Sequence, residues 1–208
     1  MTARSHPGLF VVLEGGDGAG KSTQGQRLKT WLSDAGHGVV MTYEPGDTAI
    51  GRSIRQMVLD PDSGDPSPRT EALLYAADKA QHVDEVVRPA LLRGDVVVCD
   101  RYVDSMVAYQ GAGRVLDAAE VHRIADWATG GLVPDLTVLL DVEVHRGLGE
   151  KVERDRLESA GDDFHERVRQ HFLALAAAAP QRYLVLDARE SREAIESAIR
   201  ERVEALLA

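Results

Sequence analysis

Five short runs of apolar residues divide the chain and predict the strands of one sheet. Each run is continuous rather than alternating with polar residues, as expected for strands that are buried on both faces. The longer segments between and after them have helical spacing. Strands that alternate with helices predict an α/β fold, a five-stranded, mostly parallel sheet with helices on both faces. The strands are expected at residues 9–13, 39–43, 96–99, 136–140 and 183–186, and the helices at 21–35, 71–93, 117–129, 165–179 and 192–207.

The sequence contains no internal repeat and no long linker, so residues 1–208 are expected to form a single domain. One stretch rich in Pro, Asp and Ser, residues 60–69, is typical of an exposed loop. In open α/β sheets, ligands bind at the carboxyl ends of the strands. Functional residues are therefore expected in the stretches that follow Leu13, Tyr43, Cys99 and Leu140.

The first of these stretches reads EGGDGAGKST, from Glu14 to Thr23. It matches the phosphate-binding P-loop pattern, and it lies between an apolar run and an amphipathic segment, as that motif requires. Glycines let backbone N–H groups converge on phosphate oxygens, Lys21 can reach the outer phosphates, and the Ser22 hydroxyl suits Mg²⁺. The segment predicts a nucleoside triphosphate site made of Gly15, Gly16, Asp17, Gly18, Ala19, Gly20, Lys21, Ser22 and Thr23.

The third apolar run leads into Asp100, Arg101 and Tyr102. An acid at that strand end can hold Mg²⁺ through water, and the adjacent arginine can clamp a second phosphate. A structural ion pair is the alternative interpretation. The stretch after Leu140 lacks the Asn/Thr-Lys-x-Asp motif with which GTPases read their base, which argues against a GTPase.

The composition of the chain indicates which classes of binding partner and which cellular compartment to expect. The net charge of -10 argues against nucleic acid or an anionic membrane surface as the main partner. The apolar run before Glu14 has only five residues, too short for a signal peptide or a membrane span. Because Cys99 is the only cysteine, no internal disulfide can form and a reducing compartment is expected. These features favour a cytoplasmic protein.

Taken in order, the motifs resemble those of the thymidylate kinases over nearly the whole chain. After EGGDGAGKST they read EPGDT (44–48), LLYAADKAQHV (73–83), DRYVDSMVAYQGAGR (100–114), PDLTVLLDV (134–142), RDRLE (154–158) and LVLDA (184–188). The stretch DRY…S…AYQG is the most specific of these. The resemblance implies a P-loop kinase fold with a short lid and a homodimer. It also implies transfer of the γ-phosphoryl group of ATP to dTMP, with Mg²⁺ held by Ser22 and Asp100.

The resemblance further implies how the acceptor dTMP is held. Asp17 would face the sugar 3′-hydroxyl rather than the ATP phosphates; alternatively it braces the loop. Arg101 and Arg55 would bind the phosphate of dTMP. Tyr75 would stack on thymine, or else belong to the core. Tyr109 would pack against the sugar where a 2′-hydroxyl would clash.

Three further side chains would contact the base. They are Ser105, Gln110 and Lys79, the last at a position where many family members have an arginine. Ser105 and Gln110 have an alternative role as capping or turn residues, and Lys79 as a solvated helix charge. The family commonly has Arg-Glu-Pro-Gly-Gly-Thr where this chain has Tyr43 to Thr48, so one arginine is absent and Asp47 is added.

Phosphoryl transfer requires positive charge at the transferring group. Lys21 and Arg101 are two of its expected sources. The P-loop carries no arginine, so the resemblance places the others in the lid, at about residues 146–161, with Arg154 and Arg156 as candidates. A solvated charged loop is the alternative. Two other functions remain open: a related P-loop kinase for another nucleoside monophosphate or a deoxynucleoside, and a catalytically inactive nucleotide-binding regulatory protein.

Overall fold

The computed structural model describes residues 6–143, 156–157 and 159–208. Its strands form one sheet in the order β2-β3-β1-β4-β5, and every neighbouring pair is parallel. The prediction of a five-stranded parallel sheet is confirmed. The strands are β1 (Leu9–Gly15), β2 (Val39–Tyr43), β3 (Val96–Asp100), β4 (Leu136–Asp141) and β5 (Tyr183–Asp187).

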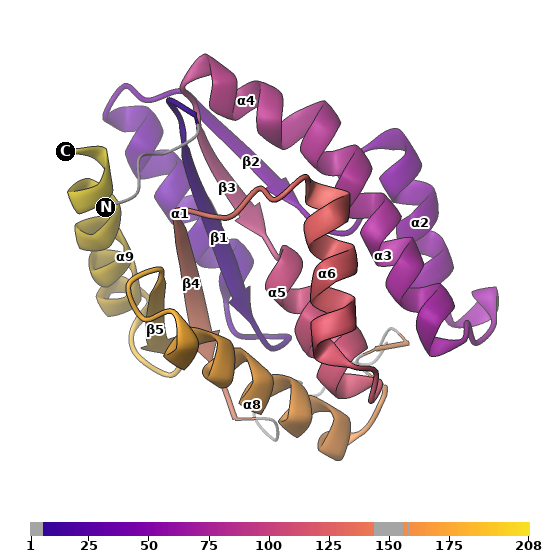
Figure 1. Cartoon of the computed structure of the whole chain (residues 1–208). Helices are drawn as coiled ribbons and strands as arrows, with labels where there is room; N and C mark the ends of the chain where they lie inside the picture. Colours follow the sequence, from indigo (N-terminus) through magenta and orange to yellow (C-terminus); the bar gives the residue numbers. More distant parts are fainter. Residues whose placement is uncertain (1–5, 144–155, 158) are drawn as a thin grey trace.

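Helices cover both faces of this sheet (Figure 1). Helices α1 (Lys21–Asp34) and α9 (Arg192–Leu207) pack on one face, where they cover Leu9, Val11 and Leu13 of β1. Helix α4 (Arg88–Arg93) packs on the opposite face, against Phe10 and Val12. Successive side chains of a strand point to opposite faces, so β1 is buried along its whole length. This explains why its apolar run is unbroken.

The helices begin and end close to the positions predicted from spacing, with some differences. The described helical segments are α1 (Lys21–Asp34), α2 (Ala49–Leu59), η1 (Pro61–Ser63), α3 (Pro68–His82), η2 (Val83–Val87), α4 (Arg88–Arg93), α5 (Val103–Met106), η3 (Val107–Gly113), α6 (Ala118–Thr129), α8 (Asp162–Ala178) and α9 (Arg192–Leu207).

Three departures from the predicted helices have local causes. The segment expected as one helix over 71–93 is α3, a π-helical turn η2 and α4, and α3 starts earlier because Ser67 caps it. Helix α2 was not predicted; it is capped by Thr48, whose hydroxyl accepts from the Gly51 N–H. Residues 103–113 form α5 and the π-helical η3, whose wider turns do not follow the 3.6-residue spacing.

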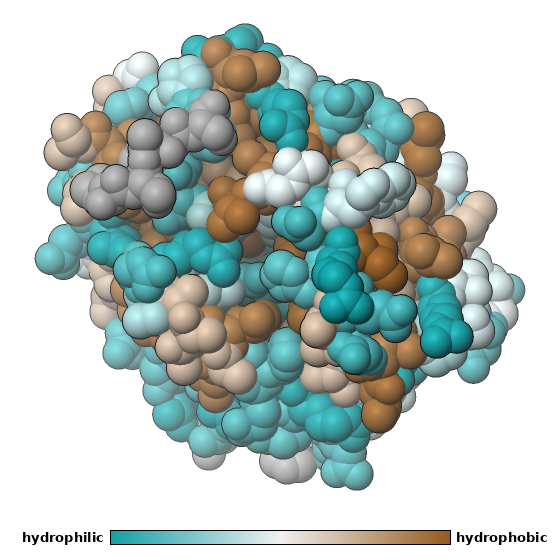
Figure 2. Space-filling model, viewed as in Figure 1, coloured by the Kyte–Doolittle hydropathy of each residue, from teal (hydrophilic) through white to brown (hydrophobic). Residues whose placement is uncertain are grey.

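The surface seen in Figure 2 carries apolar side chains scattered among hydrophilic ones. Among the described residues, no helix combines the length and the apolar character needed to cross a membrane.

Candidate active site

The parallel register brings the strand ends with functional residues to one edge of the sheet. Leu13 of β1 pairs with Asp100 of β3, and Asp100 also pairs with Tyr43 of β2. On the other side of β1, Gly15 pairs with Leu140 of β4. The P-loop, residues 15–23, therefore starts beside the carboxyl ends of two other strands, as expected for a ligand site in this fold.

Two glycines give the P-loop its course. Gly15 has a φ of 135°, and a Cβ there would lie 2.3 Å from the carbonyl oxygen of Leu140. Gly20 has a φ of 92° and immediately precedes α1. Only glycine adopts these conformations without strain. The loop thus turns tightly over the end of β4 and directs the start of α1, with its unpaired N–H groups, toward the cleft.

Lys21 reaches back across the loop. Its ammonium donates to the carbonyl oxygens of Gly16, at 2.8 Å, and Gly15, at 3.1 Å. Burial, followed by the nearby Arg101, lowers the pKa of Lys21 to about 8. An anionic phosphate in the loop would raise that pKa again, so the lysine is suited to hold one.

Ser22 and Asp100 form an oxygen-rich pair at the mouth of the same loop. The Ser22 hydroxyl donates to Asp100 Oδ2 at 2.9 Å. Hard oxygen ligands suit Mg²⁺, which usually takes only one or two protein ligands and completes its shell with phosphate and water. Ser22 and Asp100 are the residues that would hold the ion.

Asp17, the acid within the P-loop, turns toward Arg101. Its Oδ1 accepts from Arg101 Nη2 at 2.6 Å. Burial raises the pKa of Asp17, but the charges of Arg101 and Lys21 outweigh burial, and the pKa lies below its usual range. Asp17 is therefore ionised at neutral pH, and Arg101 neutralises it.

Arg101 itself has a strained backbone, with a φ of 70°. Its N–H donates to the carbonyl oxygen of Leu13 at 2.9 Å, and its guanidinium lies 5.1 Å from the centre of the Tyr109 ring. Non-glycine residues persist in this region only where the surroundings hold them, and such residues concentrate at functional sites.

Glu14, which the sequence analysis did not single out, lies under Arg101. Its carboxylate accepts from the N–H groups of Tyr102, at 2.9 Å, and Ser105, at 3.1 Å, and from the Ser105 hydroxyl, at 2.6 Å. Burial, followed by the charge of Asp104, raises the pKa of Glu14 to about 7. Glu14 thus fixes the turn that presents Arg101 to the site.

Two open clefts meet at Asp17 and Arg101. The P-loop cleft, about 1270 Å³, is lined by Asp17, Gly18, Gly20, Lys21, Ser22, Thr23, Met41, Thr42, Tyr43, Glu44, Arg55, Asp100 and Arg101. The α3 cleft, about 580 Å³, is lined by Asp17, Glu44, Pro45, Arg55, Leu59, Tyr75, Lys79, Arg101, Ser105, Met106, Tyr109, Gln110 and Leu157. All eight side chains expected to hold the acceptor line the α3 cleft. The P-loop cleft has Lys21, Ser22 and Asp100 together.

Several of these side chains are engaged with protein partners. Arg55 donates to the carbonyl oxygen of Pro45 at 2.8 Å. The Ser105 hydroxyl donates a hydrogen bond to Glu14 and accepts one from Arg101 Nη1 at 3.1 Å. Tyr75 and Tyr109 are buried at the cleft wall. The site is thus largely preformed.

Lys79 is neither solvated nor alone. Its ammonium donates to Glu44 Oε2 at 2.6 Å, and only 1% of the residue is exposed. Burial lowers the pKa of Lys79, but the charges of Glu44 and Asp78 outweigh it, so the pKa is raised. The second Glu44 oxygen pairs with His82 Nδ1 at 2.7 Å. Lys79 is thus a fixed cation in the cleft wall.

Asp47 lies away from the α3 cleft. Its Oδ2 accepts from the Thr42 hydroxyl at 2.5 Å, and the same hydroxyl contacts His82 Nε2 at 2.6 Å. The acid that distinguishes EPGDT from the family pattern therefore braces β2 against α3.

Of the two arginines expected in the lid, Arg154 lies outside the described residues. Arg156 Nη2 donates to the Glu71 carboxylate, and Arg156 Nε to the Val58 carbonyl oxygen at 3.0 Å. Arg156 does not line the P-loop cleft, so the structure does not bring it to Lys21. Its place in phosphoryl transfer stays a prediction.

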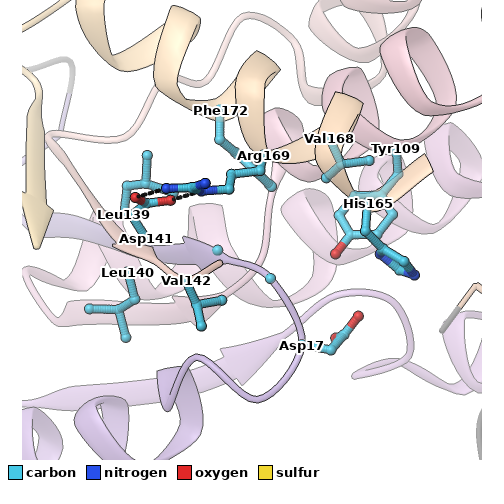
Figure 3. A pocket seen from close by; sticks show the side chains of 12 residues that line it. Asp17, Tyr109, Leu139, Leu140, Asp141, Val142, His165, Val168, Arg169 and Phe172 are labelled. Atoms are coloured by element: carbon cyan, nitrogen blue, oxygen red, sulfur yellow. Dashed lines mark hydrogen bonds and ion pairs between the residues drawn. The ribbon is translucent and has the colours of Figure 1, made fainter. Parts of the chain in front are cut away.

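A third cavity, of about 440 Å³, lies on the other side of Asp17, between the P-loop, β4 and α8 (Figure 3). At one end Arg169 of α8 binds both oxygens of Asp141, at 2.7 and 2.8 Å. His165 and Tyr109 lie together at the other end, toward Asp17. The Arg169–Asp141 ion pair fastens α8 to the end of β4.

Three acids that organise the site, Glu14, Glu44 and Glu71, were not predicted from the sequence. Each is almost fully buried and binds two or more partners. The sequence does contain one indication of the role of Glu71. Glu71, Tyr75, Lys79 and His82 recur at helical spacing, so they share one face of α3. Because this face carries charges as well as an aromatic residue, its spacing alone does not predict that all of it is buried.

Three features define this protein as a P-loop kinase. They are a P-loop at the end of a parallel strand, the Ser22–Asp100 pair, and a second cleft that is lined by arginines. The family model described as thymidylate kinase matches residues 13–199. The thymidylate kinase of Cutibacterium acnes is 66% identical over 200 residues, which cover 96% of this chain and 98% of the relative. That of Clavibacter michiganensis is 58% identical over 205 residues, 97% of both chains. The chain belongs to the thymidylate kinase family.

A solved structure supports the same assignment. The crystal structure of thymidylate kinase from Ehrlichia chaffeensis superposes with a TM-score of 0.76 at 28% sequence identity. The match covers 96% of this chain and 98% of the other.

Proposed function

We propose that this chain transfers the γ-phosphoryl group of ATP to dTMP and releases dTDP and ADP. One observation carries the proposal: Asp17 and Arg101 line both clefts, so a phosphate bound in the α3 cleft would lie directly beside one held in the P-loop. In-line phosphoryl transfer requires that juxtaposition. Membership of the thymidylate kinase family supports dTMP as the acceptor.

The residues have separate tasks in this proposal. The backbone N–H groups of residues 15–23 and the Lys21 ammonium hold the triphosphate. Arg101 and Arg55 bind the phosphate of dTMP, and Asp17 accepts a hydrogen bond from the sugar 3′-hydroxyl. The acceptor phosphate is already ionised at neutral pH, so the reaction requires no strong general base.

Mg²⁺ bound by Ser22 and Asp100 would neutralise charge on the β- and γ-phosphates of ATP. The arginine in the described part of the lid, Arg156, would add positive charge at the transferring group if it leaves Glu71. Arg154 is the second lid candidate.

The base-facing residues of the α3 cleft are Tyr75, Lys79, Ser105 and Gln110. Tyr75 offers an aromatic face, while Lys79 and Gln110 offer polar atoms to the edge of thymine. Tyr109, under the Arg101 guanidinium, would exclude a 2′-hydroxyl and favour deoxyribose.

We also propose that the enzyme works in the cytoplasm as a homodimer. Helices α2 and α3 pack against each other and expose Ile50, Met57 and Leu73, with 51–58% of each residue accessible. Exposed apolar side chains on adjacent helices suit burial against a second copy. Light scattering of the purified protein should give twice the monomer mass of 22.6 kDa. A monomer at micromolar concentration would contradict the dimer.

The decisive test of activity is initial-rate ADP formation with Mg²⁺-ATP and a panel of acceptors: dTMP, dUMP, dCMP, dGMP, dAMP, UMP and thymidine. We expect turnover with dTMP and weak turnover with dUMP. Better turnover of another monophosphate would retain a P-loop kinase and discard dTMP as substrate. ATP binding without turnover of any acceptor would favour a nucleotide-binding regulatory protein.

A further inference from the structure

Two buried acids orient the polar side chains that face the α3 cleft. Glu44 accepts from Lys79 at 2.6 Å, and Glu71 accepts from Gln110 Nε2 at 2.9 Å. The exposed fraction is 3% for Glu44 and 0% for Glu71. Lys79 and Gln110 are each 1% exposed, yet both line the cleft. Glu71 is not among the residues that line the cleft and sits behind Gln110, whereas Glu44 itself lines the cleft together with Lys79.

The contact with Glu71 fixes which end of the Gln110 amide faces the cleft. An ionised carboxylate can only accept hydrogen bonds, so Gln110 turns its NH₂ group toward Glu71. The carbonyl oxygen, Oε1, is at the other end of the same planar amide group. Gln110 is thereby held as a hydrogen-bond acceptor toward the cleft, whereas Lys79 can only donate.

Three partners keep Glu71 ionised despite its burial. Arg114 donates to both of its oxygens at 3.1 Å, and Arg156 and Gln110 complete its shell. Burial raises the pKa of Glu71, but the hydrogen bonds from Arg114, Gln110 and Arg156 outweigh burial and leave the pKa below its usual range. The orientation of Gln110 is therefore stable at neutral pH.

We propose that Glu71 is a positioning residue that makes the cleft select an imide base by holding Gln110 as an acceptor in the cleft that Lys79 lines as a donor. The proposal rests on the proposed function, with the base of a nucleoside monophosphate in this cleft. Thymine presents its O4 acceptor next to its N3–H donor, which complements Lys79 and Gln110. Cytosine presents the reverse, an N4 amino donor next to the N3 acceptor. Its binding would leave buried groups on both sides unpaired.

The test compares kcat/KM for dTMP and dCMP in the wild-type chain and three variants. Glu71→Gln supplies a side chain that can donate or accept, so Gln110 can turn either way. We expect the dTMP:dCMP ratio to fall by at least ~10-fold, the value of one unsatisfied buried polar group. Glu71→Asp retains the carboxylate and should keep most of the preference.

Arg114→Gln is the matched control, because it removes a charge from the same cluster and leaves the carboxylate facing Gln110. It should keep the dTMP:dCMP ratio within ~3-fold of wild type, even if both KM values rise. A Glu71→Gln enzyme with the wild-type ratio would overturn the proposal, and so would an equal loss of selectivity in Arg114→Gln. Either result would make Glu71 a structural ion-pair partner only.

Thermal unfolding shows whether Glu71→Gln folds. If the variant does not fold, we would measure the binding of N3-methyl-dTMP to the wild-type chain by competition with dTMP. This experiment tests whether the cleft accepts a hydrogen bond from the N3–H group. The methyl group removes the N3–H donor, so we expect binding at least ~10-fold weaker; equal binding would overturn the proposal. Failure of the wild-type chain to phosphorylate dTMP would contradict the proposed function itself. Turnover of dTMP with an unchanged ratio in Glu71→Gln would contradict only the role of Glu71.

Discussion

Asp17 of the P-loop and Arg101 at the end of β3 form an ion pair of 2.6 Å, 84 residues apart in the chain. This contact explains how a phosphate-binding loop accommodates a carboxylate. The acid pairs with a cation that lines both clefts. It thereby joins the expected donor and acceptor sites.

Replacement of Asp17 by alanine should weaken use of dTMP and spare ATP binding. The variant loses the acceptor for the sugar hydroxyl and leaves Arg101 without its neutralising partner. We expect a higher KM for dTMP or a lower kcat, by at least ~10-fold for a lost charge-assisted hydrogen bond. Steady-state kinetics with dTMP and a direct ATP-binding assay check this. Unchanged dTMP kinetics would rule out the assigned role.

Replacement of Asp100 by asparagine should raise the Mg²⁺ concentration needed for half-maximal activity, by ~10-fold or more. The reason is the loss of one anionic oxygen beside Ser22. Activity is measured against Mg²⁺ at fixed ATP. Asp95→Asn, immediately before the start of β3, is the matched control and should leave the Mg²⁺ dependence unchanged. Equal dependence in both variants would exclude Asp100 from the metal site.

Glu14 should make the protein less stable as pH rises from about 4.5 to about 7. The unfolded chain releases this proton near the usual pKa of 4.5, while the folded chain retains it up to about 7. Over that range the folded state binds more protons, so the free energy of unfolding falls with increasing pH. Urea unfolding of Glu14→Gln should show a smaller fall across this range than wild type.

Glu190→Gln, at an exposed position, serves as the control for that experiment and should retain the wild-type pH dependence. Asp78, whose pKa burial and the charge of Glu44 raise to about 6, contributes a slope of the same sign. The slope of Glu14→Gln should therefore be reduced but not abolished. Parallel curves for Glu14→Gln and wild type would contradict the raised pKa.

Replacement of Arg156 by alanine should lower turnover by ~10³-fold or more, as for other arginines that stabilise the transferring phosphoryl group, with little effect on dTMP affinity. Arg114→Ala is the control, because Arg114 shares the Glu71 carboxylate but lies outside the lid. It should change stability similarly and turnover much less. Near-normal turnover of Arg156→Ala would restrict Arg156 to its contact with Glu71 of α3.

Helix α3 shows which features of the site could be predicted from local sequence and which could not. The sequence placed Tyr75 and Lys79 on one helix but left open whether Lys79 was a solvated charge. In the structure Lys79 is 1% exposed, because Glu44, from the stretch after β2, supplies its counter-ion. No periodicity within α3 encodes a partner 35 residues away. The same applies to Gln110, whose orientation depends on Glu71, 39 residues earlier.

The sequence by itself determined the parallel sheet, the P-loop and the family, because unbroken apolar runs, glycine conformations and ordered motifs are local properties of the chain. The tertiary structure decided which charges pair: Asp17 with Arg101, Glu44 with Lys79, and Glu71 with Gln110 and two arginines. Buried charges require partners that long-range packing brings within hydrogen-bonding distance. The polarity of the acceptor cleft is therefore a property of the folded molecule.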